Sequence, residues 1–172
     1  MKNIVLIGMP GAGKSTVGVL LAKSLLMDFT DTDLVIQKYT KKALCDIIND
    51  RGTEYFISLE EEIIVGEEFY NTVVATGGSA VYGDNAMKKL KENGICIYLK
   101  VDLPQLIKRL GDISTRGIAM DKDMDIPTLY RNRTPLYEKY ADITIDCTDK
   151  TPEECVGIAI EKLNKLNGEK ND

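Results

Sequence analysis

The stretch Gly8-Met-Pro-Gly-Ala-Gly-Lys-Ser15 decides the fold of this chain. It fits the pattern GxxxxGK[ST] of a phosphate-binding loop, whose glycines let backbone N–H groups turn toward phosphate oxygens. The apolar run Asn3–Ile7 before it predicts a buried strand, and the run Thr16–Leu26 after it has apolar residues at helical spacing. Because strand, loop and helix in this order are the context that the motif requires, we predict a phosphate ligand here rather than a chance glycine turn.

Two side chains at the end of this loop have defined chemistry. Lys14 brings a positive charge to the outer phosphates, and the Ser15 hydroxyl can ligate Mg²⁺. The start of the following helix adds the positive end of its dipole.

The rest of the chain alternates between short apolar runs and helical patterns. We predict further strands near Asp28–Thr30 and at Thr72–Ala75, Ile95–Lys100 and Ile143–Asp146. We predict helices in pieces over Asp33–Phe69 and at Gly83–Glu92, Pro104–Leu110, Pro127–Tyr140 and Thr151–Leu166. Such alternation predicts an α/β fold with a parallel sheet covered on both faces. The length of 172 residues predicts a single domain over residues 1–172.

Residues 111–126 differ from this pattern. They contain Gly, Ser, Thr, Asp and Lys, few apolar residues and no strong period. A stretch of this length between two helices predicts a lid over a ligand site rather than a simple connector.

Composition excludes several functions. The net charge is −5 and no basic run is present, which argues against nucleic acid or an anionic membrane as a partner. The chain has no histidine, so acid–base work falls on carboxylates, Lys, Tyr or Cys. Its cysteines are scattered and predict reduced thiols in the core; they are Cys45, Cys96, Cys147 and Cys155. With an apolar strand at the start and no long apolar stretch, we expect a cytoplasmic protein.

Asp31 and Asp33 follow the predicted second strand, where ligands of an open parallel sheet bind. Both would face one side if the strand continued through them. One carboxylate near Mg²⁺ and one near an attacking hydroxyl suit phosphoryl transfer to an alcohol. The alternative is that Asp31 or Thr32 caps the helix from Leu34, which does not exclude catalysis.

A glycine pair and three arginines are further candidates for contacts with a ligand. Gly77-Gly78 follows the third strand and either approaches a ligand or forms a tight turn. Three arginines lie around the expected lid, where cations can screen the charge of a transferred group, although a surface role is the alternative for each; they are Arg109, Arg116 and Arg133. Pro135 and Tyr137 follow Arg133 and are expected to fix the hinge side of the lid.

In combination, these elements resemble the shikimate kinase family. The resemblance rests on Gly8–Thr16, Asp31-Thr-Asp33, Gly77-Gly78-Ser-Ala80, Arg116 and Arg133-Thr-Pro-Leu-Tyr137, in family order over nearly the whole chain. It implies a three-layer P-loop kinase fold with five parallel strands in the order 2-3-1-4-5 and a lid. It also implies a monomer that uses ATP and Mg²⁺ to phosphorylate the 3-hydroxyl of shikimate, a small-molecule acceptor.

The resemblance also implies roles for individual residues. It implies that Arg109 lies against the adenine of the nucleotide, with Lys150–Pro152 on the other side, and that Arg116 contacts the phosphates. It also implies that the nucleotide is bound by the loop residues Gly11, Ala12, Gly13, Lys14, Ser15 and Thr16. Asp31 would support Mg²⁺ together with Ser15. Asp33 would hold the acceptor hydroxyls and act as base, Gly78 would offer its N–H, and Arg133 would pair with the acceptor carboxylate. Catalysis is assigned to Lys14, Asp33 and Arg116.

One position departs from the family pattern. The family has an arginine after the Phe of a Gly-x-x-x-Phe-Arg run, and here Ile57 follows Phe56. A lost charge-assisted bond costs about 1.5–3 kcal/mol. Ser79 also replaces a third glycine, and the lid has Gly117-Ile-Ala where the family has Pro-Leu-Leu.

The departure at position 57 leaves three hypotheses. The chain is a shikimate kinase with weak acceptor binding or with another cation in the gap, for which Lys41, Lys42 and Arg51 are candidates. Alternatively, it is a related kinase for a different hydroxylated acceptor. The third possibility, a nucleotide-binding protein without transfer activity, is disfavoured because the catalytic positions are all present.

Overall fold

The computed structural model describes residues 2–111 and 117–168, and its sheet confirms the predicted topology. Five parallel strands lie in the order β2-β3-β1-β4-β5. The strands are β1 (Asn3–Ile7), β2 (Asp28–Asp31), β3 (Thr72–Ala75), β4 (Gly94–Lys100) and β5 (Ile143–Asp146). The helices are α1 (Lys14–Leu25), α2 (Thr32–Thr40), α3 (Leu44–Arg51), α4 (Thr53–Gly66), α5 (Asp84–Glu92), α6 (Leu103–Leu110), α7 (Ile126–Tyr140) and α8 (Pro152–Gly168), with a 3-10 turn η1 (Ala80–Tyr82).

Strand β1 is the middle of the sheet because it is apolar from Ile4 to Ile7 and buried at every residue. Ile4 lies opposite Val73 of β3 on one side and Ile95 of β4 on the other. A strand that is buried on both faces needs such a continuous apolar run, as expected for a parallel sheet.

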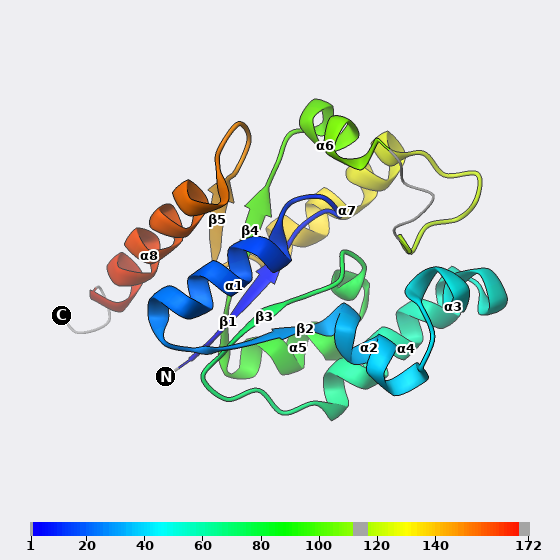
Figure 1. The fold of residues 1–172 in the computed structure, drawn as a ribbon, viewed down its shortest axis with the longest axis horizontal. Coiled ribbons are helices and arrows are strands. Elements are labelled where there is room, and N and C mark those ends of the chain that lie inside the picture. The colour runs from blue at the N-terminus through cyan, green and yellow to red at the C-terminus, as the bar shows by residue number, and fades with distance from the viewer. Residues whose placement is uncertain (1, 112–116, 169–172) are drawn as a thin grey trace.

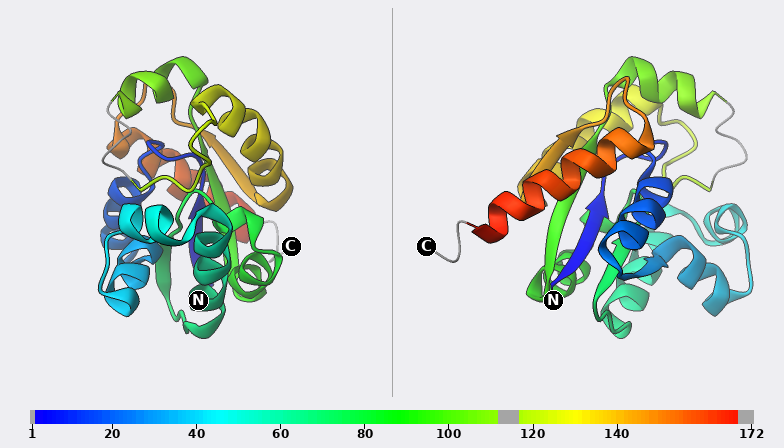
Figure 2. Two further views of the ribbon diagram at one scale, coloured as in Figure 1. Left: turned by 90° about the vertical axis from the view of Figure 1, so that its right-hand side faces the viewer. Right: turned by 60° about the vertical axis from the view of Figure 1, so that its left-hand side comes forward.

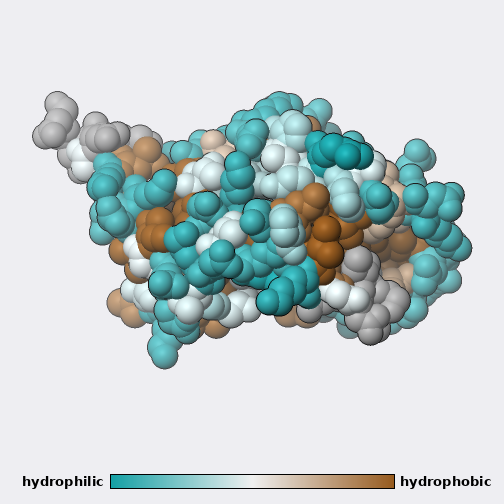
Figure 3. Space-filling model, turned by 90° about the horizontal axis from the view of Figure 1, so that it is seen from above, coloured by the Kyte–Doolittle hydropathy of each residue, from teal (hydrophilic) through white to brown (hydrophobic). Residues whose placement is uncertain are grey.

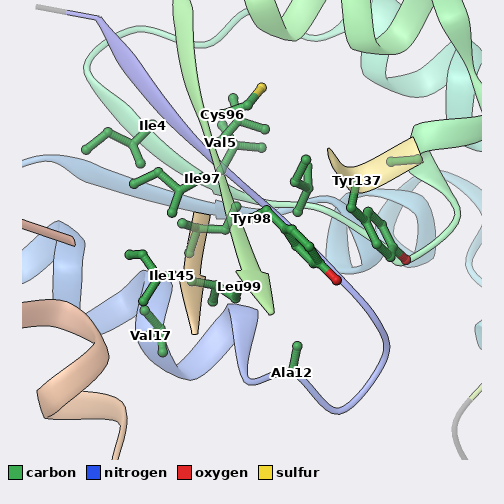
Figure 4. Packing of buried hydrophobic residues seen from close by; sticks show 14 of the residues in the cluster. Ile4, Val5, Ala12, Val17, Cys96, Ile97, Tyr98, Leu99, Tyr137 and Ile145 are labelled. Atoms are coloured by element: carbon green, nitrogen blue, oxygen red, sulfur yellow. The ribbon is translucent and has the colours of Figure 1, made fainter. Parts of the chain in front are cut away.

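Helices cover both faces of the sheet, which gives the three layers (Figure 1). Helices α1 and α8 pack side by side on one face, while α5 and α7 lie on the other (Figures 1 and 2). Helices α2, α3 and α4 extend beyond the β2 edge (Figure 1). On the α7 side, the rings of Tyr98 and Tyr137 stack with their centroids 5.2 Å apart (Figure 4).

The segment after β2 confirms the alternative expectation for Asp31, which is a helix cap. The strand ends at Asp31 instead of continuing through Asp33, because Asp31 is the N-cap of α2 and its Oδ1 accepts a hydrogen bond from the Asp33 N–H. Two breaks then divide the following helical region. Lys41 (φ 56°) ends α2, and Gly52 (φ 86°) separates α3 from α4. Gly52 adopts its positive φ without strain because it has no Cβ.

The fold places several loops at one edge of the sheet. The loop after β1, the start of α2 and the turn after β3 all lie at the carboxyl ends of neighbouring strands (Figure 1). The face seen from above is mostly hydrophilic, with apolar residues in separate patches (Figure 3). Among the described residues, no helix has the length and apolar character needed to cross a membrane.

Candidate active site

A cleft of about 510 Å³ opens at this edge of the sheet. The phosphate-binding loop and the start of α1 form one wall, and the turn after β3 forms another. Helix α2 contributes Asp33 and Gln37, and α7 contributes Arg133. Lys14 and Arg133 are the cations among the described residues of its lining. The cleft therefore joins a phosphate-binding loop, a carboxylate and a second cation.

The loop is arranged around the Lys14 side chain. Its Nζ donates hydrogen bonds to the carbonyl oxygens of Gly8 (2.7 Å) and Met9 (2.9 Å). Burial lowers the pKa of Lys14 to about 8. Gly11 and Gly13 have φ values of 81° and 89°, which lets the backbone curve at these two positions. The result is a concave loop with an ammonium group held at its base.

Ser15 and Asp31 form a contact between α1 and the end of β2. The Ser15 hydroxyl donates to Asp31 Oδ2 over 2.6 Å. Asp31 thus uses one oxygen to cap α2 and the other to hold Ser15. Two hard oxygen donors are therefore adjacent at the start of α1, beside the loop.

Asp33 lies in the first turn of α2, with its side chain in the cleft. Burial, together with the Asp31 carboxylate, raises the pKa of Asp33 to about 6. Lys14 acts in the opposite direction. Asp33 is therefore mostly ionised near pH 7 and has a higher proton affinity than an ordinary aspartate.

The turn after β3 is packed too closely for side chains at two positions. A Cβ on Gly77 would lie 2.3 Å from Glu60 Oε1 and 2.8 Å from Asp33 Oδ1. A Cβ on Gly78 would lie 2.7 Å from Arg133 Nη1. The glycine pair therefore allows the close approach of two carboxylates and a guanidinium to the backbone.

Hydrogen bonds hold the same turn in place. The Gly77 N–H donates to Thr32 Oγ1 over 3.0 Å. The Tyr137 hydroxyl donates to the Gly78 carbonyl over 2.7 Å, so Tyr137 fixes the turn after β3. Helices α2 and α7 are thereby both tied to the turn.

Arg133 is the most deeply placed cation of the cleft. Only 1% of its surface is exposed, and its Nη2 donates to the Ala119 carbonyl over 2.6 Å. Its guanidinium lies 5.4 Å from the centre of the Tyr82 ring. Its Nε has no hydrogen-bond partner among the described residues. A buried guanidinium with an unused donor is a suitable group for an anionic ligand.

The other predicted site residues lie around the cleft. Ala12 is buried under the loop, and Thr16 lines the cleft at the start of α1. Arg109 lies on α6 and donates to the Gly11 carbonyl over 3.2 Å, so it contacts the outer side of the loop. Arg116 and part of the expected lid (residues 112–116) lie outside the described residues.

The structure brings none of the candidate substitutes for the missing arginine into the described lining of the cleft. Lys42 pairs with Asp50 over 2.9 Å, and Arg51 lies 4.2 Å above the Tyr55 ring. Ile57 itself lines an adjoining hollow of about 390 Å³, which shares Ala119 with the main cleft. Arg51 lines the same hollow, so it is the one of the three candidates that lies beside the Ile57 position. Cys45, expected in the core, is instead half-buried at the edge of the cleft.

Sequence reasoning did not assign Glu60 to the site. This residue of α4 is 1% exposed, and one of its oxygens accepts a hydrogen bond from the Ser79 hydroxyl. A signal was present, because Glu60 shares the buried face of α4 with Phe56, Ile63 and Ile64. A single charged residue on an apolar helix face indicates a specific polar partner.

Comparisons with known proteins agree with this arrangement. The model of the family described as Shikimate kinase matches residues 10–164. A curated shikimate kinase of Thermodesulfovibrio yellowstonii is 39% identical, with 99% of both chains covered.

Solved structures are similar over the same extent. A shikimate kinase from Acinetobacter baumannii, solved in complex with shikimate, has a TM-score of 0.85 and 28% identity over 100% of this chain and 96% of the other. The shikimate kinase of Aquifex aeolicus has a TM-score of 0.78 and 30% identity over 96% of this chain and 98% of the other. On the match to the family model and these relatives, the chain belongs to the shikimate kinase family.

Proposed function

We propose that this chain transfers the γ-phosphoryl group of ATP to the 3-hydroxyl of shikimate. The observation that carries the proposal is the arrangement of the cleft, in which Asp33, the phosphate-binding loop and the buried Arg133 line one cavity. An alcohol that also carries a carboxylate fits this arrangement. Its hydroxyl would meet Asp33, and its carboxylate would meet Arg133.

The loop binds the phosphates of ATP through its backbone N–H groups. Lys14 now donates to two carbonyl oxygens of its own loop, and it exchanges these partners for phosphate oxygens when ATP binds. Arg109 lies on the adenine side, and Arg116 contacts the phosphates from the lid.

Mg²⁺ is part of the proposal because the oxygen donors suit it. The Ser15 hydroxyl and the Asp31 carboxylate are hard ligands 2.6 Å apart. Residues 2–111 and 117–168 contain no cluster of three or more His, Cys, Asp or Glu that could hold a metal without the substrate. A magnesium ion held by Ser15, supported by Asp31 and completed by phosphate oxygens would neutralise charge on the phosphates.

Asp33 carries the proton transfer. The acceptor O–H bond breaks as its oxygen bonds to the γ-phosphorus, the proton passes to the Asp33 carboxylate, and ADP leaves with the electrons of the broken P–O bond. A pKa of about 6 leaves Asp33 ionised at pH 7 and close to the value that suits a general base.

Arg133 holds the acceptor carboxylate, with the Gly78 N–H as a further donor. With Ile57 at the second arginine position of the family, this single guanidinium supplies the charge-assisted bonds. A lost bond of this kind costs about 1.5–3 kcal/mol, which is roughly ten- to hundredfold in affinity. We therefore expect a high KM for shikimate.

Ile57 also supports a second candidate function. An apolar side chain at this position favours an acceptor without a carboxylate there, such as another cyclic alcohol. A panel of cyclic alcohols, tested beside shikimate for acceptor-dependent ADP release, separates the two candidates.

Asp33→Asn tests the role of Asp33 in either case. Asparagine retains the size of the side chain but cannot accept the proton. We expect a fall in kcat of at least about a hundredfold, with the Kd for ATP changed less than about twofold. Near-normal turnover would contradict the role of Asp33 as base.

The remaining parts of the proposal concern the whole molecule. We propose one catalytic domain over residues 1–172, with a lid at residues 111–126, that works as a cytoplasmic monomer. Size-exclusion chromatography with light scattering tests the monomer directly.

A further inference from the structure

The buried carboxyl group of Glu60 has no task in the transfer described above. It lies in the interior of α4 with 1% of its surface exposed. Burial raises the pKa of Glu60 to about 7, and the Ser79 hydroxyl, Arg133 and Lys14 act in the opposite direction. A carboxylate at such a site is costly and is retained only where it has specific partners.

One oxygen of Glu60 has a partner and the other lies against bare backbone. Oε2 accepts the hydrogen bond from Ser79 Oγ. Oε1 has no hydrogen-bond partner among the described residues and lies 2.3 Å from the position that a Cβ would take on Gly77. The Ser79 bond therefore fixes the rotation of the carboxyl group, and the carboxyl group fixes the position of Gly77.

Gly77 is in turn packed between Glu60 and Asp33. Asp33 Oδ1 lies 2.8 Å from the position that a Cβ would take on Gly77. The Gly77 N–H also donates to Thr32 Oγ1. Any movement of the Glu60 carboxyl group is thus passed to the backbone that lies against Asp33. The next residue, Gly78, lies against Arg133 in the same way.

We propose that Ser79 and Glu60 form a positioning pair that sets the Gly77–Gly78 turn relative to Asp33 and Arg133, and thereby the affinity for the acceptor. This role rests on the proposed function, because it presumes that the acceptor binds between these two side chains. Neither member of the pair needs to touch the acceptor, because both act through the turn. The nucleotide loop makes no hydrogen bond with the pair in the described residues, although Lys14 lies close enough to lower the pKa of Glu60. We therefore expect the pair to affect acceptor binding more than ATP binding.

The experiment is a double-mutant cycle on the full chain, with KM for shikimate and for ATP measured by ADP release. Ser79→Ala removes the hydroxyl, and we expect KM for shikimate to rise about tenfold while KM for ATP stays within about twofold. We expect Glu60→Ala likewise to raise KM for shikimate while KM for ATP stays within about twofold. Adding Ser79→Ala to Glu60→Ala is expected to cause no further rise in KM for shikimate. Glu60→Gln keeps an acceptor oxygen for Ser79 and is expected to raise KM less than Glu60→Ala.

Glu62→Gln is the matched control, because Glu62 is an exposed residue of the same helix. It is expected to leave both KM values unchanged. Circular dichroism melting of each variant identifies any loss of fold.

The possible outcomes separate the two proposals. Equal rises in both KM values, no rise for Ser79→Ala, or additive effects in the double variant would overturn the positioning pair while wild-type turnover of shikimate stands. A wild type without shikimate-dependent ADP release would overturn the proposed function and the acceptor role of the pair together.

Discussion

Replacing Gly77 with alanine tests the packing of the turn most severely. The new Cβ would lie 2.3 Å from Glu60 Oε1 and 2.8 Å from Asp33 Oδ1. Both values are well below van der Waals contact, and Glu60 cannot swing away because it is buried and bound to Ser79. Overpacking of this kind costs about 1–3 kcal/mol of folding free energy.

The same substitution should impair turnover. Asp33 must move to admit the methyl group, and a displacement of about 1 Å at a reacting group can cost roughly a hundredfold in rate. We therefore expect Gly77→Ala to lower kcat between about tenfold and a hundredfold. Because the three atoms nearest to the new Cβ belong to Glu60 and Asp33 and none to the phosphate-binding loop, KM for ATP should change less than about twofold.

Gly157→Ala is the matched control. Gly157 lies inside α8, and a Cβ there would meet no atom within 4 Å. Alanine in a helix interior should therefore stabilise the protein by about 0.5–1 kcal/mol and leave the kinetics unchanged. Urea denaturation and ADP-release kinetics measure both effects. Wild-type stability and turnover in Gly77→Ala would refute the account of the turn.

Three further predictions concern binding and pH. Ile57→Arg is expected to lower KM for shikimate about tenfold, and a loss of activity would favour another acceptor. ATP affinity is expected to fall about tenfold between pH 7 and pH 9, because Lys14 has a pKa of about 8 and loses its charge in the free protein. Equal affinities at the two pH values, measured by calorimetry, would contradict this. Glu60→Gln is expected to gain roughly 2.5 kcal/mol of stability relative to wild type between pH 5 and pH 8. The reason is that the pKa of Glu60 is raised from 4.5 to about 7 in the folded state, so wild type loses stability as pH rises through this window. Urea denaturation at both pH values measures that change, and a difference independent of pH would count against the buried carboxyl group.

The strands and most helices were predictable because their signals are local. The apolar run of β1 and the glycine loop after it are visible in the sequence, and both lie as predicted. The sequence left the end of β2 open between two expectations, because alternation would let the strand continue through Asp33 whereas Asp31 could also cap the following helix. The helix cap that ends the strand depends on how the Asp31 side chain turns back onto the Asp33 N–H.

The site was predictable where a motif carries the chemistry. Lys14, Ser15, Asp33 and Arg133 all lie at the described cleft. The contact between Glu60 and Ser79 could not be predicted, because α4 and the turn after β3 meet only in the folded chain. The position of the Arg51 side chain could not be predicted either, because its contact with the Tyr55 ring depends on the turn between α3 and α4.

The most direct measurement of the central claim is phosphorus NMR of the purified protein with ATP, Mg²⁺ and shikimate. We expect the γ-phosphate signal to be replaced by a phosphate monoester on the 3-hydroxyl of shikimate, in equal amount to ADP. We expect Asp33→Asn to slow this conversion at least about a hundredfold. ADP formed with inorganic phosphate alone, or no conversion despite bound ATP, would contradict it.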